Sequence, residues 1–453
     1  MRRWFNSPRW KSWSQDSLLR GIIKNSSYLL GSNSLSIFLS VVQGVLAARL
    51  LGVADYGLVA AVVIPFVSNV HRLLSFRMSE LVVKYLSQFL VKGERDKAGG
   101  VIKGAALVEA ATSAVAYLVL LLLAPWAARW LAHDPQAMPL FLIYGLVLFL
   151  NGAYETALGV LQATRQFRWI AAVNLAQNLL TASIILIAFL TGGNRLLVLL
   201  AYLAGKGLAG LALGGLALYQ LSRELGRGWL MRSSVRNLSW RELSRFAVST
   251  NLHATINLLV RDSETLLVTA LRSTVEAGYF KIALGVINLV LMPVEPLIAT
   301  TYAEITRSVT QRDWKTTRRL LKRVSQISGL WTVFSGGGLI LTGYWLIPLV
   351  YGMEYRPAYP ALAVLLVGYG CANVLNWNRT LLLALELPTY PIKVAGLTGL
   401  VKTMLTLLLA PAWGYVMEAV ILSAYFVSSI SWMARRGLVE MKTREAKESP
   451  AAA

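Results

Sequence analysis

Long, uninterrupted apolar runs constrain this chain more than any other feature of its sequence. Twelve runs are long enough to cross a bilayer as helices, which takes roughly 20 apolar residues each. Twelve such helices need about 240 apolar residues, and hydrophobic residues make up 56% of the 453-residue chain. No stretch is left to build the core of a soluble enzyme, and a membrane β-barrel is excluded because its strands would alternate apolar and polar residues. The runs cover residues 28–51, 57–76, 101–124, 138–163, 170–191, 196–219, 245–271, 277–300, 324–350, 360–385, 392–412 and 414–434.

The positions of the lysines and arginines predict the orientation of these spans. With the N-terminus in the cytoplasm, and with residues near the span ends counted with the adjoining loops, the cytoplasmic segments hold 35 of the 44 Lys and Arg residues, the external loops five and the span interiors four. Such an excess follows the positive-inside rule, and it predicts that both termini are cytoplasmic. The same placement explains most of the net charge of +22. We therefore expect anionic membrane lipids, and not nucleic acid, as the partner of the basic charge.

The two halves of the chain resemble each other, which predicts an internal duplication. Asn151 and Asn373 lie in corresponding spans, Arg95-Asp96 corresponds to Arg312-Asp313, and the offsets between such matches are 217–222 residues. Each repeat has an even number of spans, so both have the same topology, with a cavity expected between two lobes. The predicted segments are a basic and aromatic N-terminal segment (1–27), an N-lobe (28–221), a cytoplasmic linker (222–244), a C-lobe (245–434) and a disordered cytoplasmic tail (435–453). The predicted fold is thus an all-α polytopic membrane protein of two pseudo-symmetric six-helix lobes.

Enzymatic chemistry has no support in the sequence. Cys371 is the one cysteine and the three histidines are scattered, which excludes a disulfide framework and makes a metal site improbable. The P-loop, zinc-protease and nucleophile-elbow motifs are missing, so neither an ATP-driven pump nor a hydrolase is indicated. We expect no cofactor, and a proton or sodium gradient is the candidate energy source for transport.

Polar residues inside the spans are the candidate functional residues, because an ionisable group at that depth normally faces a cavity or a partner. Spacings of three and four residues place each set on one helical face. We interpret the sets as the lining of a water-filled cavity with cations for an anionic substrate, while helix-packing hydrogen bonds and buried pairs such as Arg261–Glu264 are the alternative. The sets are His253, Asn257, Arg261 and Glu264 in span 245–271; Lys281, Gly285, Asn288, Met292 and Glu295 in span 277–300; Asn151 and Glu155 in span 138–163; and Lys206 in span 196–219.

The carboxylates inside the spans outnumber the cations. A cationic cavity therefore requires that several carboxylates pair or face elsewhere, and we interpret Glu109 and Glu418, near span ends, as structural. The candidates for proton or sodium coupling are Asp262, Glu264, Glu295, Glu155 and His253. The six carboxylates are Glu109, Glu155, Asp262, Glu264, Glu295 and Glu418, and the four cations are Lys206, Arg261, Lys281 and Lys402.

Three short motifs resemble a known family. Ala48-Arg49-Leu50-Leu51-Gly52 with Asp55-Tyr56-Gly57 resembles the first hairpin of the polysaccharide biosynthesis (O-antigen flippase-like) proteins, which belong to the multidrug/oligosaccharidyl-lipid/polysaccharide (MOP) exporter superfamily. Asp262, Leu266-Leu267 and Ala277-Gly278-Tyr279 resemble the matching hairpin of the second half. Leu349-Val350-Tyr351-Gly352, followed by Glu354-Tyr355, Pro357-Ala358 and Pro360-Ala361, resembles an external loop of the family.

The resemblance implies a V-shaped exporter fold like that of the multidrug and toxin exporters (MATE), and alternating access in a bacterial or archaeal cytoplasmic membrane. It implies a flippase that moves undecaprenyl-pyrophosphate-linked oligosaccharides to the outer leaflet during O-antigen or exopolysaccharide synthesis, with glycosyltransferases or a polymerase as candidate partners. A pyrophosphate is bound by Arg or Lys. We therefore expect the substrate at Arg261, Lys281, Arg49, Arg72 and Lys206, with the amides of Asn257, Asn288 and Asn151.

Two alternatives stay open. A cation-coupled multidrug exporter of the same superfamily would use an acidic cavity for cationic drugs, and the interior carboxylates suit that function. A membrane-embedded polysaccharide polymerase or ligase is the second alternative. Such enzymes typically have a large external loop, and the longest external segment here, about residues 125–137, is short.

Overall fold

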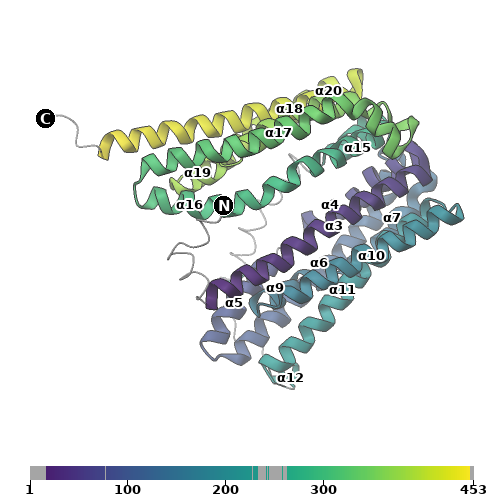
Figure 1. The fold of residues 1–453 in the computed structure, drawn as a ribbon. Coiled ribbons are helices and arrows are strands. Elements are labelled where there is room, and N and C mark those ends of the chain that lie inside the picture. The colour runs from purple at the N-terminus through teal and green to yellow at the C-terminus, as the bar shows by residue number, and fades with distance from the viewer. Residues whose placement is uncertain are drawn as a thin grey trace. The chain divides into compact units, whose positions relative to one another are not determined.

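The computed structural model describes residues 17–76, 78–226, 228–232, 241, 243, 258 and 263–448, and all regular structure in this part of the chain is helical (Figure 1). The first half contains α3 (Ser17–Tyr56), the π-helix η1 (Gly57–Val63), α4 (Ile64–Leu74), α5 (Met78–Val91), α6 (Arg95–Trp130), η2 (Pro135–Ala137), α7 (Met138–Gly145), α8 (Val147–Leu150), α9 (Tyr154–Ala163), α10 (Phe167–Thr191), α11 (Arg195–Glu224) and α12 (Trp229–Arg232). The second half contains α14 (Glu264–Leu271), α15 (Thr274–Leu291), η4 (Met292–Val294), α16 (Glu295–Thr310), α17 (Trp314–Tyr351), η5 (Met353–Tyr355), α18 (Ala358–Val374), α19 (Asn378–Ala384) and α20 (Thr389–Glu448).

Nine helical segments within the described residues are long and apolar enough to cross a membrane. Two of them, Leu35–Leu74 and Thr389–Ala446, each contain one non-helical glycine. Gly52 (φ 70°) falls in the short gap between predicted spans 28–51 and 57–76, and Gly414 (φ 74°) is the first residue of predicted span 414–434. The all-α, multi-pass fold is confirmed. The count of twelve stays a prediction, because most of predicted span 245–271 lies outside the described residues.

Helices begin at capping residues that the sequence supplies in the polar loops. The Asn194 side chain accepts a hydrogen bond from the Leu197 N–H at 3.1 Å at the start of α11, and Asp313 accepts one from the Thr316 N–H at 2.9 Å at the start of α17. Such caps satisfy N–H groups that have no partner within the helix. The bonds to the Thr316 backbone and side chain hold the pKa of the exposed Asp313 carboxyl below its usual value.

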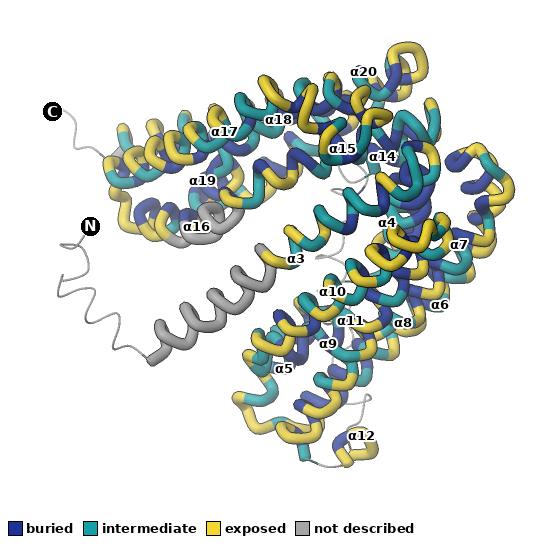
Figure 2. Tube along the Cα trace, turned by 45° about the vertical axis from the view of Figure 1, so that its right-hand side comes forward, coloured by how far each residue is buried: buried dark blue, intermediate teal, exposed yellow. Residues whose placement is uncertain are grey.

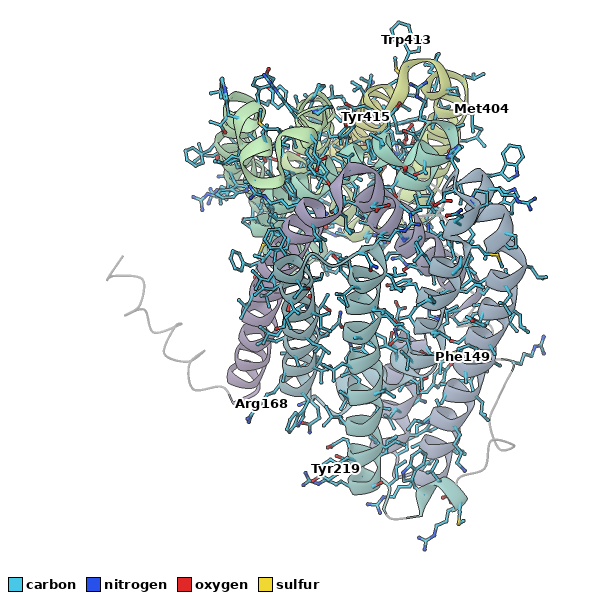
Figure 3. The ribbon with its side chains drawn as sticks, turned by 90° about the vertical axis from the view of Figure 1, so that its right-hand side faces the viewer. Phe149, Arg168, Tyr219, Met404, Trp413 and Tyr415 are labelled. Carbon is cyan, nitrogen blue, oxygen red and sulfur yellow. The ribbon has the colours of Figure 1, made fainter. Side chains whose placement is uncertain are left out.

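The break at Gly414 is held by an ion pair from another loop. Glu276 accepts hydrogen bonds from the Tyr415 N–H and from Arg272 Nε, both at 2.9 Å, and Arg272 donates to the Pro411 carbonyl at 2.8 Å. These bonds satisfy backbone groups that the interrupted helix leaves without partners. Figure 3 shows Trp413, which is 69% exposed, projecting outward from this turn.

Left-handed backbone positions repeat along the chain at a nearly constant spacing. Such conformations are uncommon outside glycine, so their recurrence is informative. The paired positions are Gly93 and Arg312, His133 and Gly352, Arg165 and Glu386, and Gly192 and Gly414, which are 219, 219, 221 and 222 residues apart. Gly52, Gly226 and Gly228 have no counterpart of this kind among the described residues. The spacing agrees with the predicted internal duplication, because corresponding turns in both halves use the same backbone conformation.

Contacts divide the chain into two compact units that do not follow its midpoint. The first comprises Met1–Leu50, Val70–Ala124 and Pro139–Leu252. The second comprises Leu51–Asn69, Pro125–Met138 and His253–Ala453, so two segments from the first half group with the second unit. The lobe and linker boundaries that the sequence predicts stay a prediction.

Two glycines of the family-like motifs explain why η1 belongs to the second unit. A Cβ on Gly57 would lie 1.9 Å from the Thr274 carbonyl oxygen, and a Cβ on Gly278 would lie 2.8 Å from the Val53 carbonyl oxygen. No other residue allows backbones to approach so closely. Gly57 and Gly278 are 221 residues apart, so equivalent positions of the two repeats pack against each other.

In the first unit, α11 packs against α8 through another close backbone approach. A Cβ on Gly210 would lie 2.2 Å from the Leu150 carbonyl oxygen and 2.5 Å from Asn151 Oδ1. Gly214, one turn further along α11, has nothing within 4 Å of its Cβ position. Figure 2 shows buried and exposed residues interleaved along α11, as expected of a helix with one packed face.

Gly210→Ala should destabilise the protein, because the added methyl group collides with a backbone carbonyl that belongs to another helix. We expect a loss of about 1–3 kcal/mol in the free energy of unfolding, the usual cost of overpacking. Thermal unfolding of the detergent-purified protein measures this loss as a lower Tm. Gly214→Ala is the matched control, with a Tm equal to or above that of the wild type. Equal Tm values for both variants would contradict the close approach.

Candidate functional site

A membrane-depth helix of the first unit is interrupted, and a buried carboxylate holds the interruption. α8 ends at Leu150 and α9 begins at Tyr154. Glu109 on α6 is 2% exposed and accepts hydrogen bonds from the Glu155 N–H at 2.8 Å, the Thr156 N–H at 2.9 Å and the Thr156 hydroxyl at 2.7 Å. A carboxylate at a helix N-terminus satisfies N–H groups and interacts favourably with the helix dipole. Glu109 is therefore the cap of α9, consistent with its structural interpretation.

The second unit has a helix interruption at the corresponding place, and uncharged side chains stabilise it. α18 ends at Val374 and α19 begins at Asn378. Asn376 Nδ2 donates to the Ser328 hydroxyl at 3.0 Å, and Trp377 Nε1 donates to the Ser325 hydroxyl at 2.7 Å. Both serines lie on α17. Interrupted helices at equivalent places in two repeats are a common position for transport sites in membrane proteins.

A second pair of equivalent positions also differs in charge. In the first unit, Gln43 Nε2 on α3 donates to the Asn178 carbonyl on α10 at 2.8 Å. Glu264 lies 221 positions after Gln43, and Lys402 lies two residues beyond the position that corresponds to Asn178 at the 222-residue spacing of the Gly192–Gly414 pair. In the second unit Glu264 and Lys402 form an ion pair, with Lys402 Nζ 3.1 Å from Glu264 Oε1. One repeat thus has an amide contact where the other has a charged one.

Lys402 also pairs with a second carboxylate, Glu418, on the far side of the Gly414 break in α20. Its Nζ lies 3.2 Å from Glu418 Oε1. Lys402, Glu264 and Glu418 are 2%, 3% and 0% exposed; we call them the buried triad. Met404, two residues after Lys402, is 58% exposed and lies on the outer side of α20 (Figure 3). The triad is thus enclosed within the second unit.

Two interior lysines contrast with Lys402. Lys206 on α11 is exposed and Lys281 on α15 is half-buried, and neither has an ion pair or hydrogen bond with a described residue. The stripe predicted on α15 lies on its less buried side, since Asn288 is exposed while Phe280 and Ile287 are fully buried. A Cβ on Gly285, one turn from Lys281, would meet nothing within 4 Å. Among the described residues, these two lysines thus lack the carboxylate partners that Lys402 has.

The remaining predicted residues are in varied surroundings. Arg49 and Arg72 are exposed, close to the ends of α3 and α4. Asn151 lies in the first interruption, half-buried, and its Oδ1 accepts no hydrogen bond from the described residues. Glu155 accepts a hydrogen bond from the Ser79 hydroxyl. Four predicted residues, His253, Asn257, Arg261 and Asp262, lie outside the described part of the chain, as does the side chain of Glu295.

The buried triad was not predicted as a unit. The sequence identifies Glu264 as a coupling candidate and Lys402 as a cation at mid-span, but it pairs Glu264 with Arg261 as an alternative and treats Glu418 as structural. The sequence did contain one indication of the triad. A charged lysine at mid-span has a high free energy in the membrane, so Lys402 needs a carboxylate partner from another span. Only the packing of α14 and both arms of α20 shows which carboxylates provide it.

Sequence and structure comparisons agree with this architecture. Residues 45–360 match the family described as polysaccharide biosynthesis proteins. Inner membrane protein YghQ of Escherichia coli (strain K12) is 27% identical over 356 residues, which cover 77% of this chain and 98% of that protein. The inward-facing conformation of a multidrug resistance MATE family transporter of the MOP superfamily matches with a TM-score of 0.74 at 10% identity, covering 92% of this chain and 96% of that chain. The lipid II flippase MurJ in an inward closed conformation matches with a TM-score of 0.66 at 13% identity, covering 93% of each chain.

The two structural matches establish the fold, and the family match covers more than half of the chain. This chain is a multi-pass helical membrane protein that shares its fold with both of these proteins. The chain therefore belongs to the family of polysaccharide biosynthesis proteins.

Proposed function

We propose that this protein flips undecaprenyl-pyrophosphate-linked oligosaccharides from the inner to the outer leaflet of the cytoplasmic membrane by ion-coupled alternating access. The observation that carries the proposal is the pair of unpaired lysines, Lys206 and Lys281, at membrane depth in a polysaccharide biosynthesis protein. A cation without a carboxylate partner is costly in a membrane. A pyrophosphate supplies the missing negative charge.

The charge pattern favours an anionic substrate over a cationic drug. The four interior carboxylates whose side chains are described all have protein partners: Glu109 caps α9, Glu155 accepts from Ser79, and Glu264 and Glu418 pair with Lys402. A cationic drug would need a carboxylate that is free to pair with it. The likeness to a multidrug transporter concerns the fold, so multidrug export remains the alternative and not the conclusion.

The physical properties of the proposed substrate suit such a transporter. A glycan is strongly hydrated and needs a polar route, whereas a polyprenyl chain is stable in lipid. Asn151 and Asn288 provide amides for sugar hydroxyls, while Arg49 and Arg72 add cations near the ends of their helices. In this proposal both termini are cytoplasmic, as the positive-inside rule predicts. Glycosyltransferases or a polymerase of the same pathway would supply or receive the lipid-linked glycan.

Lys206→Gln and Lys281→Gln should each slow flipping about tenfold, because a charged hydrogen bond to a phosphate contributes about 1.5–3 kcal/mol. The measurement is the transfer of a fluorescent undecaprenyl-pyrophosphate oligosaccharide between leaflets of proteoliposomes. Lys206→Arg and Lys281→Arg should retain most of the transfer, because guanidinium also binds phosphate. Lys393→Gln, which removes an exposed lysine from α20, is the control with unchanged transfer.

Wild-type transfer rates in both glutamine variants, at equal amounts of inserted protein, would show that these lysines do not bind the substrate. A separate assay addresses the alternative function. Organic-cation efflux from the same vesicles, in the absence of glycolipid transfer, would assign the protein to the drug exporters.

A further inference from the structure

The buried triad has one more negative than positive group. With all three side chains ionised, two carboxylates face one ammonium, and the sum is −1. The members are at most 3% exposed, so no water shares the excess charge. An uncompensated charge in such surroundings is far more costly than a paired one, and binding one proton to a carboxylate removes it.

The contacts of Lys402 favour Glu418 as the carboxylate that takes the proton. Lys402 Nζ donates to Glu264 Oε1 at 3.1 Å. The contact with Glu418 is an ion-pair distance of 3.2 Å without hydrogen-bond geometry, and Glu418 accepts no well-aligned hydrogen bond from the described residues. Thr406, fully buried and one turn after Lys402, has its hydroxyl beside the Glu418 carboxyl. A protonated Glu418 would donate its O–H to this hydroxyl oxygen.

No further described charge compensates the triad from the helices around it. α15, which packs on α14 and α20, carries Glu276 and Lys281; Glu276 is bonded to Arg272, and Lys281 makes no ion pair with the triad. η1 and α18 carry no Asp, Glu, Lys, Arg or His, and α18 contributes Tyr359, Tyr369 and Cys371 as its other titratable groups. α19 carries Arg379, which is not among the charges that act on Glu264 or Glu418. Arg261 and Asp262, just before α14, lie outside the described residues.

We infer that Lys402, Glu264 and Glu418 form a proton-binding site in the second unit, and that the proton is the coupling ion of the transporter. The role in coupling rests on the proposed function; the proton site itself does not. The proton adds to a Glu418 oxygen and changes the triad from −1 to neutral. The Lys402 ammonium lies between the two carboxylates, where a sodium ion would otherwise bind, so the site selects the proton. The first unit has Gln43 at the position of Glu264 and Leu180 at the position of Lys402, so it has no equivalent site there.

Infrared difference spectroscopy of the purified protein in lipid nanodiscs tests the site without any substrate. At neutral pH the wild type should show the carbonyl band of a protonated carboxyl group, which disappears when the pH is raised. Glu418→Gln and Glu264→Gln should each lose this band, because either change leaves a neutral pair of one carboxylate with Lys402. Glu109→Gln should keep it, since Glu109 caps α9 in the first unit and has no contact with the triad.

Size-exclusion profiles and Tm values identify variants that fail to fold. Glu445→Gln, on the exposed part of α20, controls for the loss of any carboxyl group. The proton site is wrong if folded Glu418→Gln and Glu264→Gln proteins both keep the band, or if Glu109→Gln loses it.

The coupling role is tested in proteoliposomes with the fluorescent glycolipid. A pH gradient should accelerate transfer by the wild type and have no effect on Glu418→Gln, while a sodium gradient should affect neither. Acceleration by sodium alone would overturn the coupling role. If the wild type transfers no glycolipid, the proposed function and the coupling role both fail, whereas the infrared band still decides the proton site.

Discussion

The absence of water from the bilayer core governs this structure, because every polar group at that depth needs a partner within the protein. The two helix interruptions show the consequence. The N–H groups freed at the start of α9 are bound by Glu109, and the polar side chains beside the α18–α19 break are bound by Ser325 and Ser328. The same requirement places Lys402 between two glutamates. Once these needs are met, Lys206 and Lys281 are the interior lysines left for a ligand.

The two repeats share their backbone but not their charges. Turns with left-handed conformation recur at spacings of 219–222 residues, and both interruptions occur in corresponding helices. The charged side chains, however, lie at different places in the two repeats. The first repeat uses a glutamate at its interruption and amides at the α3–α10 contact, while the second uses hydroxyls at its interruption and an ion pair at the equivalent contact. Duplication therefore supplied a common framework, and side-chain changes gave each unit a different buried charged group.

Much of the fold could be predicted from the sequence, because apolar length and helical periodicity are local properties. The all-α membrane fold, the repeat and the polar side of α15 were predictable in this way. Gly57 and Gly278 belonged to recognisable motifs, but their mutual contact depends on how η1 crosses α15. The left-handed turns at Arg165 and Glu386 had no local signal, since neither residue favours that conformation.

The candidate site was less predictable, because partners at membrane depth come from spans far apart in the chain. Glu264 and Lys402 are 138 residues apart, and their pairing depends on the packing of α14 against α20. Glu109 was correctly interpreted as structural, but its role as a cap required knowledge of where α9 begins. Periodicity shows which residues share a helix face, and it does not show which helices that face meets.

The two unpaired lysines, Lys206 and Lys281, have no lysine at the corresponding position of the other repeat, although the backbones of the repeats correspond. The residue 221 positions after Lys206 is Val427, and the residue 221 positions before Lys281 is Ala60. Equivalent lysines in both repeats would create two equivalent anion sites. Lysines at non-equivalent positions instead give each unit a different arrangement of positive charge. The substrate that we propose, a lipid with a single pyrophosphate between a glycan and a polyprenyl chain, has no two-fold symmetry, and an asymmetric charge pattern on a repeated backbone would suit the binding of such a molecule in one orientation.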